Sequence, residues 1–381
     1  MSYDIPKSHI PVKKKLTAIS LFSGAGGMDV GFANAGFDIL WANDYDPAAC
    51  KTYSLNHSSP VVCGDVNDHW NALADFKGID VLFGGPPCQG FSVAGKMDPS
   101  DERSKLLWAF VHAVDVLKPR AFVCENVKAL ATLEKWGPVR ELFIKRVSAL
   151  GYGCGFVVLS ASDYGVPQSR ERVFFVGLLG SPVPNLRTLM TKYRKKSKTI
   201  RQTIEHLGPA GNPKNSRICR AKITLAKAPV LRRSPNAGML FNGLGRPLKL
   251  DGFSATLPAS MGGNKTPIVD EDELYHNKPS WVEQYHADLW NGRKPSFTAA
   301  PASLRRLTID EAIRIQTFPV DYVFHGPNSA IWRQIGNAVP PALAECVAKA
   351  VRDLLTGGGL TDHTDERGQT EMPLACFAPM K

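Results

Sequence analysis

The chain has 381 residues, of which 44% are hydrophobic, enough for about two domains with cores of their own. No apolar run approaches the ~20 residues that a membrane-spanning helix needs, and the start, MSYDIPKSHIPVKKK, lacks the apolar stretch of a secretory signal. The eight cysteines form no CxxC pair and do not cluster with the nine histidines, so neither a metal site nor a disulfide framework is predicted. We expect a soluble, cytoplasmic protein.

The net charge of +11 is concentrated in one part of the chain. Residues 181–250 contain sixteen lysines or arginines and one acid, Glu205, which gives +15. The remaining residues carry 30 basic and 34 acidic side chains. A local basic block in an otherwise balanced chain indicates a polyanionic partner, although a solvated loop or a disordered linker would have the same composition.

In the first half of the chain, short apolar or β-branched runs alternate with amphipathic segments. Segments with helical spacing are found at 46–57, 106–118 and 139–151. This rhythm predicts an α/β fold with a doubly wound, mixed but mainly parallel sheet, which binds ligands at the carboxyl ends of its strands. The expected strands are 16–22, 37–43, 60–65, 79–85, 121–127 and 171–179.

The second half is irregular at first and helical at its end. From 185 to 305, glycine, proline and lysine interrupt every periodic pattern, which indicates a second domain. Helical spacing returns at 308–318 and at 340–357, where proline opens the helix and glycines close it. The last residues, 358–381, have no period and are expected to form a mobile tail.

The first expected strand runs into the glycine-rich segment FSGAGGMDVGF at residues 22–32. Gly24, Gly26 and Gly27 allow a tight turn and a close approach to a ligand at the start of the following helix. The segment does not match the dinucleotide fingerprint GxGxxG, because Asp29 occupies the position of the last glycine. This argues against a nicotinamide-dependent oxidoreductase.

The next two strand ends each carry an acid. Asp44 follows the second strand, where such folds place an acid on ribose hydroxyls, and Tyr45 is suited to lie against a base. Asp65 and Val66 follow the third strand, where the acid can accept from an adenine amino group. Together they predict a pocket for an adenosine-bearing ligand. The alternative is that Asp44 and Asp65 only cap helices.

The fourth strand delivers Pro86, Pro87 and Cys88 to the same edge. Two prolines fix the backbone in an extended form, and the polar, glycine-bearing segment beyond them, 89–105, reads as a loop able to close over the site. A thiol placed in this way suits a nucleophile. The plainer alternative, a small buried hydrophobe, applies to most of the other cysteines.

Two further segments supply what a nucleophilic thiol needs. Glu125 ends an apolar strand, where burial should raise its pKa and let it carry a proton. Gln168, Arg170 and Arg172 alternate along an incoming strand and so share one side of it, where the arginines can bind a carbonyl, carboxylate or phosphate. A structural ion pair between Glu125 and one arginine would explain the same residues.

Five segments in this order resemble the motifs of the DNA (cytosine-5)-methyltransferases, as found in prokaryotic restriction-modification systems: FSGAGG, GGPPCQGFS, ENV, QSRERVFFVG and QIGNAVPPALA. The resemblance covers residues 16–180 and 303–357. It implies a Rossmann-like fold dependent on S-adenosyl-L-methionine. The implied cofactor-site positions are Phe22, Ser23, Gly24, Gly26, Gly27, Asp44, Tyr45, Asp65, Val66, Pro87, Leu106 and Asn337.

The resemblance also implies a mechanism. The Cys88 thiolate would add to carbon 6 of a flipped-out cytosine while Glu125 protonates or hydrogen-bonds nitrogen 3, and Arg172, assisted by Arg170, would hold the carbonyl oxygen. Family members usually carry glutamate at the position of Asp44, so a longer or water-mediated ribose contact is expected. Residues expected to contact the DNA or the flipped base are Gln89, Ser92, Arg103, Gln168, Thr256 and Leu257.

The expected organisation follows from these motifs. A basic segment at 1–15 precedes a catalytic domain at 16–184, a target-recognition domain at 185–318 and a return to the catalytic domain at 319–357. The expected partner is double-stranded DNA, bound by a nucleoid-associated monomer. A partner endonuclease is not physically required.

Two other functions are compatible with parts of this sequence. An RNA cytosine-5-methyltransferase of the same fold would carry a Cys-Phe-Thr signature, which the sequence lacks. A catalytically inactive DNA-binding relative would not need Cys88, Glu125 and Arg172 together.

Overall fold

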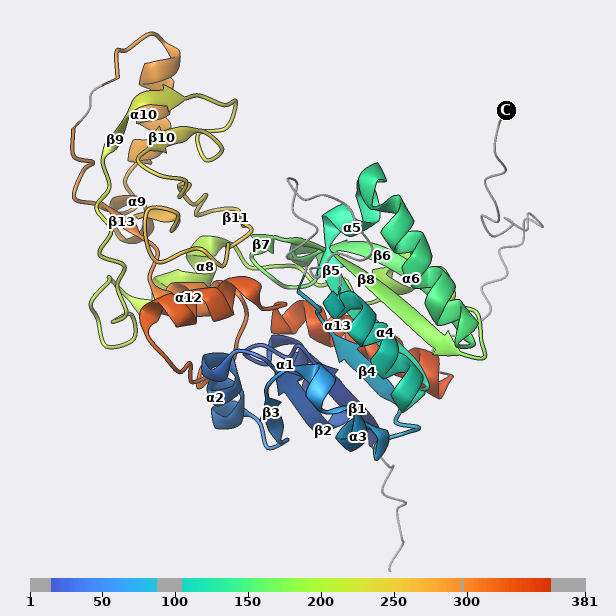
Figure 1. The fold of residues 1–381 in the computed structure, drawn as a ribbon. Helices are drawn as coiled ribbons and strands as arrows, with labels where there is room; N and C mark the ends of the chain where they lie inside the picture. The colour runs from blue at the N-terminus through green and yellow to red at the C-terminus, as the bar shows by residue number, and fades with distance from the viewer. Residues whose placement is uncertain (1–14, 88–104, 296–297, 358–381) are drawn as a thin grey trace, which may run out of the picture.

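The computed structural model describes residues 15–87, 105–295 and 298–357. Its main element is a seven-stranded sheet in the order β3-β2-β1-β4-β5-β8-β6 (Figure 1). All neighbours pair in parallel except β8, which is antiparallel to both β5 and β6. The mixed, mainly parallel sheet is therefore confirmed. Its strands are β1 (Leu16–Leu21), β2 (Phe37–Asp44), β3 (Val61–Cys63), β4 (Val81–Gly84), β5 (Ala121–Val127), β6 (Tyr152–Ser160) and β8 (Glu171–Leu179).

Strand β6 was not predicted from the sequence. Gly153 and Gly155 interrupt its apolar pattern, and glycine in a strand often marks a close approach of backbone. A Cβ atom at Gly153 would lie 2.3 Å from the carbonyl oxygen of Ser181, so the chain passes close by at this point. The glycine that weakens the sequence signal is thus required by packing.

Helices cover both faces of the sheet. One face packs against α1 (Gly27–Asn34) and α13 (Pro341–Thr356). The pair lies close enough that a Cβ atom at Gly31 would be 2.5 Å from that of Ala344. Helix α13 begins at Pro341 and ends at Gly357, whose φ is 73°, as its sequence predicted. The other face packs against α3 (Trp70–Ala74), α4 (Lys105–Leu117), α5 (Lys128–Thr132) and α6 (Gly137–Ala149).

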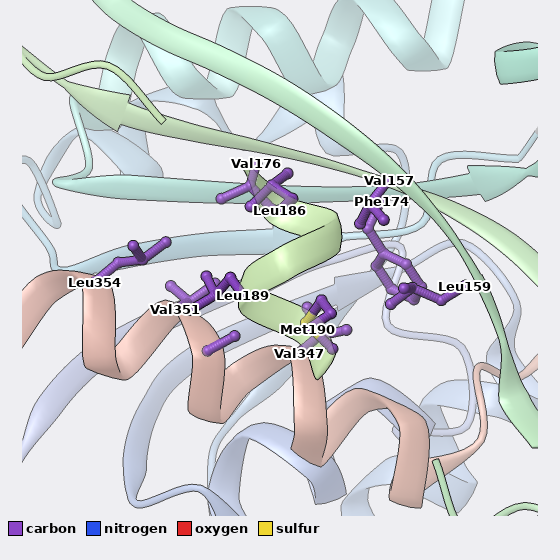
Figure 2. Close-up of a pocket in the computed structure, with 11 residues that line it drawn as sticks. Val157, Leu159, Phe174, Val176, Leu186, Leu189, Met190, Val347, Val351 and Leu354 are labelled. Carbon is purple, nitrogen blue, oxygen red and sulfur yellow. The ribbon is translucent and has the colours of Figure 1, made fainter. Parts of the chain in front are cut away.

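Helix α7 (Leu186–Thr191) joins the first face. Its side chains Leu186, Leu189 and Met190 fill the space between the sheet and α13 around a small cavity (Figure 2). Every residue that lines this cavity is apolar, so we interpret it as part of the core and not as a ligand site.

A smaller, irregular lobe lies to one side of the sheet (Figure 1). One apolar cluster joins α8 (Ile200–Ile204), α11 (Ile309–Ile315) and α12 (Asn328–Asn337), and another joins the β9–β10 hairpin to α10. The division at 185 and 318 stays a prediction. The remaining elements here are β7 (Gln168–Ser169), β9 (Leu225–Val230), β10 (Met239–Phe241), β11 (Ser254–Ala255), β12 (Ile268–Asp270), β13 (Leu304–Arg306), α9 (Glu271–His276) and α10 (Trp281–Trp290).

Helices α2 (Pro47–Asn56) and α12 connect the two lobes. The sequence predicted α2 but not α12. The hydroxyl of Thr52 donates to Gln334 Oε1 at 2.7 Å, and Arg333 Nη2 lies 2.7 Å from Asp46 Oδ2. Within the described residues, no helix is long and apolar enough to cross a membrane, and no cluster of three or more metal-ligating side chains occurs.

Candidate active site

The carboxyl ends of the parallel strands meet at one edge of the sheet, and the antiparallel β8 starts at that edge. Gly84 on β4 is paired with Cys124 on β5, and Val127 on β5 is paired with Arg172 on β8. This register brings the end of β4, the Glu125 side chain and the start of β8 together, as the sequence predicted.

Glu125 and Arg172 form an ion pair at this edge. Arg172 Nε lies 2.9 Å from Glu125 Oε1, and the two side chains are 16% and 12% exposed. Burial raises the pKa of the Glu125 carboxyl above its ordinary value, and this outweighs the opposite effects of Arg172 and Arg170. The carboxyl thus holds a proton more readily than a free glutamate while remaining in contact with a cation.

The backbone that leads to Cys88 is packed against this carboxyl. A Cβ atom at Gly85 would lie 2.8 Å from Glu125 Oε2, so a larger residue there would displace the carboxyl group. Asn126 Nδ2 donates to the carbonyl oxygen of Pro86 at 3.2 Å. Sequence reasoning missed both contacts, for which the dipeptides GG and EN were the available signal.

Four predicted site residues lie outside the described residues: Cys88, Gln89, Ser92 and Arg103. Pro87, the last described residue before them, is exposed, and Leu106 lies in the first turn of α4. The Glu125 carboxyl therefore lies beside Gly85, which is two residues before Pro87 and three residues before Cys88 in the sequence.

Arg170 has different surroundings from Arg172. It is 1% exposed, and it donates to the carbonyl oxygens of Gly336 (3.0 Å) and Asn337 (3.3 Å) at the end of α12. Burial and the nearby Arg172 lower the pKa of this guanidinium to about 9. Arg170 thus fixes the end of α12 against the start of β8.

Gln168 and Leu257 are also buried, each 0% exposed. Gln168 Nε2 donates to Gln316 Oε1 at 2.8 Å, and its Oε1 accepts from the backbone N–H of Leu257 at 3.1 Å. Thr256 is exposed, with its hydroxyl 3.5 Å from the carbonyl oxygen of Ser169. Of these three, only Thr256 has a surface that a large ligand can reach in this structure.

The glycine-rich loop lies at the end of β1. Phe22, Gly24 and Gly26 have φ values of 55°, 55° and 82°, the left-handed conformation that favours glycine. Gly24 donates its N–H to Asp44 Oδ2 at 2.7 Å, which links the loop to the end of β2. A Cβ atom at Gly24 would meet nothing within 4 Å, so this part of the loop borders open space.

The acids of the predicted adenosine pocket are at the expected edge. Burial raises the pKa of Asp44 despite hydrogen bonds from the N–H groups of Asp46 and Gly24. An ionised carboxylate has about four acceptor positions, so two remain for ligand hydroxyls. Asp65 accepts from the N–H of Asn67 at 2.9 Å and does cap the short helix η1 (Val66–Asp68), whereas α2 is capped by Asp46 and not by Asp44.

These features fit the chemistry of an adenosine group. Tyr45 is 77% exposed beside Asp44 and offers a ring face, while Val66 is buried. A Cβ atom at Gly27 would lie 2.4 Å from the carbonyl oxygen of Val339, so this glycine lies close to the segment that contains Asn337. Glycine backbone, carboxylates and an exposed aromatic ring are therefore combined at one edge.

Comparisons with known proteins agree with this arrangement. The family model for C-5 cytosine-specific DNA methylase matches residues 16–353. Type II methyltransferase M1.HphI of Haemophilus parahaemolyticus is 33% identical over 90% of this chain and 88% of its own length. M.FnuDI of Fusobacterium nucleatum is 31% identical over 89% and 94%.

Among solved structures, the S. pombe Dnmt2 methyltransferase has a TM-score of 0.64 and 19% identity, covering 90% of this chain and 99% of that one, a likeness of fold. The family match extends over almost the whole described chain and includes both strand ends of the site. The chain therefore belongs to the C-5 cytosine-specific DNA methylases and is a DNA (cytosine-5)-methyltransferase.

Proposed function

We propose that this enzyme transfers the methyl group of S-adenosyl-L-methionine to carbon 5 of a cytosine flipped out of a specific double-stranded DNA sequence. The observation that carries the proposal is the Glu125–Arg172 pair packed against Gly85, three residues before Cys88. A raised carboxyl pKa at this position suits a proton donor to nitrogen 3 of the base. Arg172 is suited to the base's carbonyl oxygen.

The proposed reaction begins with the Cys88 thiolate, which forms a bond to carbon 6. The ring electrons move toward nitrogen 3, which takes a proton from Glu125, and carbon 5 becomes nucleophilic. Carbon 5 then takes the methyl group. Loss of the proton from carbon 5 expels the thiolate, and nitrogen 3 returns its proton to Glu125, so that a methyl cation enters the base and one proton leaves it.

The cofactor residues proposed are those at the ends of β1, β2 and β3. S-adenosyl-L-methionine supplies an electrophilic sulfonium methyl group when it is bound. The glycine loop at 22–27 would receive its amino-acid part, Asp44 its ribose hydroxyls, and Tyr45 and Asp65 its adenine. The two free acceptor positions of Asp44 and the open space beside Gly24 support this assignment.

The division of labour between domains is also a proposal. The smaller lobe would read the DNA sequence, with basic residues on phosphates and Thr256 near the target base. Arg170 and Gln168 would then act by holding their neighbours, because their polar groups bind backbone and Gln316. The relatives are named as Type II methyltransferases, which supports a role in restriction-modification. We propose that the enzyme is a monomer. We also propose that methyl transfer does not need a partner endonuclease.

The test is methyl transfer by purified protein. Incubation of duplex DNA with labelled S-adenosyl-L-methionine, followed by bisulfite sequencing, should reveal 5-methylcytosine at one sequence context. Cys88→Ala should abolish transfer and leave DNA binding largely intact. Wild-type protein should remain covalently attached to DNA with 5-fluorocytosine at the target, since the fluorine cannot leave as a proton does. Residual 5-methylcytosine formation by the alanine variant would contradict the covalent mechanism.

A further inference from the structure

The glycine loop rests on a buried hydroxyl group from a distant part of the chain. The Tyr322 hydroxyl donates to the carbonyl oxygen of Ala25, which lies between Gly24 and Gly26. Ala25 and Tyr322 are 2% and 8% exposed, so this bond is shielded from water. Tyr322 belongs to the segment between α11 and α12, and its contact with Ala25 spans 297 residues of sequence.

His57 sets the direction of that hydroxyl. Its Nε2 lies 2.9 Å from the Tyr322 oxygen. A carbonyl can only accept, so the one Tyr322 proton goes to Ala25, and His57 must donate from Nε2. Burial lowers the pKa of His57 to about 4, so the ring is neutral near pH 7 with its proton on Nε2.

The imidazole packs against both Tyr53 and Gly26. It stacks on Tyr53 with the ring centres 4.2 Å apart, and a Cβ atom at Gly26 would lie 2.3 Å from its Nε2. Tyr53 is itself held, because its hydroxyl donates to Asp29 Oδ1 at 3.0 Å and lies 2.9 Å from Ser59 Oγ. Two hydrogen-bonded groups, one on the glycine loop and one between α1 and α2, are therefore joined through the stacked rings of His57 and Tyr53.

The Tyr322 ring is held independently of its hydroxyl. Its centre lies 4.7 Å from that of Phe318 and 5.4 Å from that of Phe324. Removal of the oxygen alone should therefore leave the ring in place and release only the Ala25 carbonyl.

We propose that the Tyr322 hydroxyl, oriented by His57, is a positioning group that holds the loop at 22–27 in the shape that binds the methyl donor. This inference rests on the proposed cofactor. Because the Ala25 carbonyl lies between two left-handed residues, its direction sets the course of the loop on either side. The same segment continues into α12, whose end binds Arg170, so the loop is fixed relative to the base-handling side as well.

The experiment is calorimetric titration of the full-length protein with S-adenosyl-L-methionine and, separately, S-adenosylhomocysteine. Loss of one buried hydrogen bond corresponds to about a threefold to tenfold weaker binding. Tyr322→Phe should show that loss for both compounds, with unchanged DNA affinity and unchanged kcat at saturating donor. The matched control is Tyr285→Phe, because the buried Tyr285 hydroxyl has no hydrogen-bond partner among the described residues.

A second test uses variants of His57, and its result does not depend on whether Tyr322→Phe folds. His57→Gln retains an N–H donor and should bind the donor nearly as well as wild type, whereas His57→Leu should resemble Tyr322→Phe. The double variant Tyr322→Phe/His57→Leu should be no weaker than either single variant, because both act through one hydroxyl.

Three results overturn the inference. They are wild-type donor affinity in Tyr322→Phe, an equal loss in Tyr285→Phe, and additive losses in the double variant. A change of melting temperature without a change of affinity would show a purely structural role, which also contradicts it. If the wild-type protein binds neither compound, the proposed cofactor itself is wrong and the inference falls with it.

Discussion

Two buried clusters of arginine and glutamate, one in each lobe, differ in how completely their charges are satisfied. In the smaller lobe, Arg305 binds Glu271 at 2.6 Å and both carboxylate oxygens of Glu311 at 2.6 and 2.9 Å. Glu311 also accepts from the Thr308 N–H and from Asn215. Burial lowers the pKa of Arg305, but the two acids outweigh it and raise the pKa overall.

At the sheet edge, the balance is the opposite. Glu125 meets Arg172 through Nε at 2.9 Å, and burial still raises the pKa of its carboxyl. Arg170, whose hydrogen bonds within the described residues all go to carbonyl oxygens, has a lowered pKa. The acids of the first cluster thus outweigh burial, whereas burial outweighs the ion pair at the sheet edge, and perturbed pKa values of this kind are common at active sites.

The largest expected effect comes from Glu125→Gln. The amide is nearly isosteric and can still accept from Arg172, but it has no proton to exchange with nitrogen 3. General acid–base groups contribute about 10²–10⁴-fold, so kcat should fall by a factor in this range while donor binding is retained. Single-turnover methylation assays measure this, and a fall of less than about tenfold would argue that the pair is only structural.

The same variant should show a signature in stability. The folded-state pKa of Glu125 is raised, so its favourable contribution is present below the unfolded pKa and is lost as the pH rises through the folded value. Glu125→Gln removes this loss. Its unfolding free energy relative to wild type should therefore increase with pH above about 4.3, the pKa of an unfolded glutamate. A constant or decreasing difference would contradict the raised pKa.

The next effect belongs to the other cluster. Glu311→Gln keeps the capping box with Thr308, since glutamine serves there as well as glutamate, but it leaves Arg305 with a single acid. Breaking a buried ion pair costs about 3–5 kcal/mol, so denaturant unfolding should show a loss of this size. The kcat of the folded fraction should stay near that of wild type. A Glu311→Gln variant that is as stable as wild type but inactive would show that this cluster serves the reaction and not the fold.

The two clusters also differ in how well they could be predicted from the sequence. The sequence motifs predicted that Glu125 and Arg172 lie at neighbouring strand ends, and the structure shows why. Arg172 is at the start of β8, which runs antiparallel to β5 and therefore begins at the edge where β5 ends. Arg170 and Gln168 share a side of the strand with Arg172. Alternation along a strand predicts which side a residue faces, but it does not predict its hydrogen-bond partner. Their ligands come from Gln316, Leu257 and α12, far away in sequence.

The parts that were not predicted depend on contacts between distant segments. Helix α12 buries Ile331, Trp332 and Ile335 in the apolar cluster, and its polar groups bind Thr52 and Arg170, which are both far away in the chain. The Tyr322–Ala25 bond is another such contact. Local patterns predicted most strands of the sheet and the residues at its edge. The contacts between distant segments that hold this edge in place could be seen only in the structure.

The basic block at 181–250 contains a third group of charged residues, some of which have an acidic partner and some of which have none within the described chain. Part of the basic block is neutralised on the larger lobe, which contains the sheet, where Lys192 pairs with Asp353 and Lys195 with Glu345, both on α13. Other members are exposed and form no ion pair within the described chain: Lys214, Arg220, Lys222, Lys227, Arg232 and Arg233. Lys227 lies on β9, Arg232 and Arg233 lie between β9 and β10, and the other three precede β9 in the chain. The β9–β10 hairpin belongs to the irregular lobe (Figure 1).

These unpaired cations should carry the electrostatic part of DNA binding. Each neutralised phosphate contact lowers the slope of log K against log salt by about 0.9. The triple variant Lys222→Gln/Lys227→Gln/Arg233→Gln should therefore reduce the slope by about 2–3, provided that each residue contacts one phosphate. The control Lys192→Gln/Lys195→Gln removes two lysines already paired with acids and should change the slope by less than about 1. Fluorescence anisotropy with duplex DNA at several salt concentrations measures both, and a larger change in the control would show that the DNA lies against the larger lobe instead.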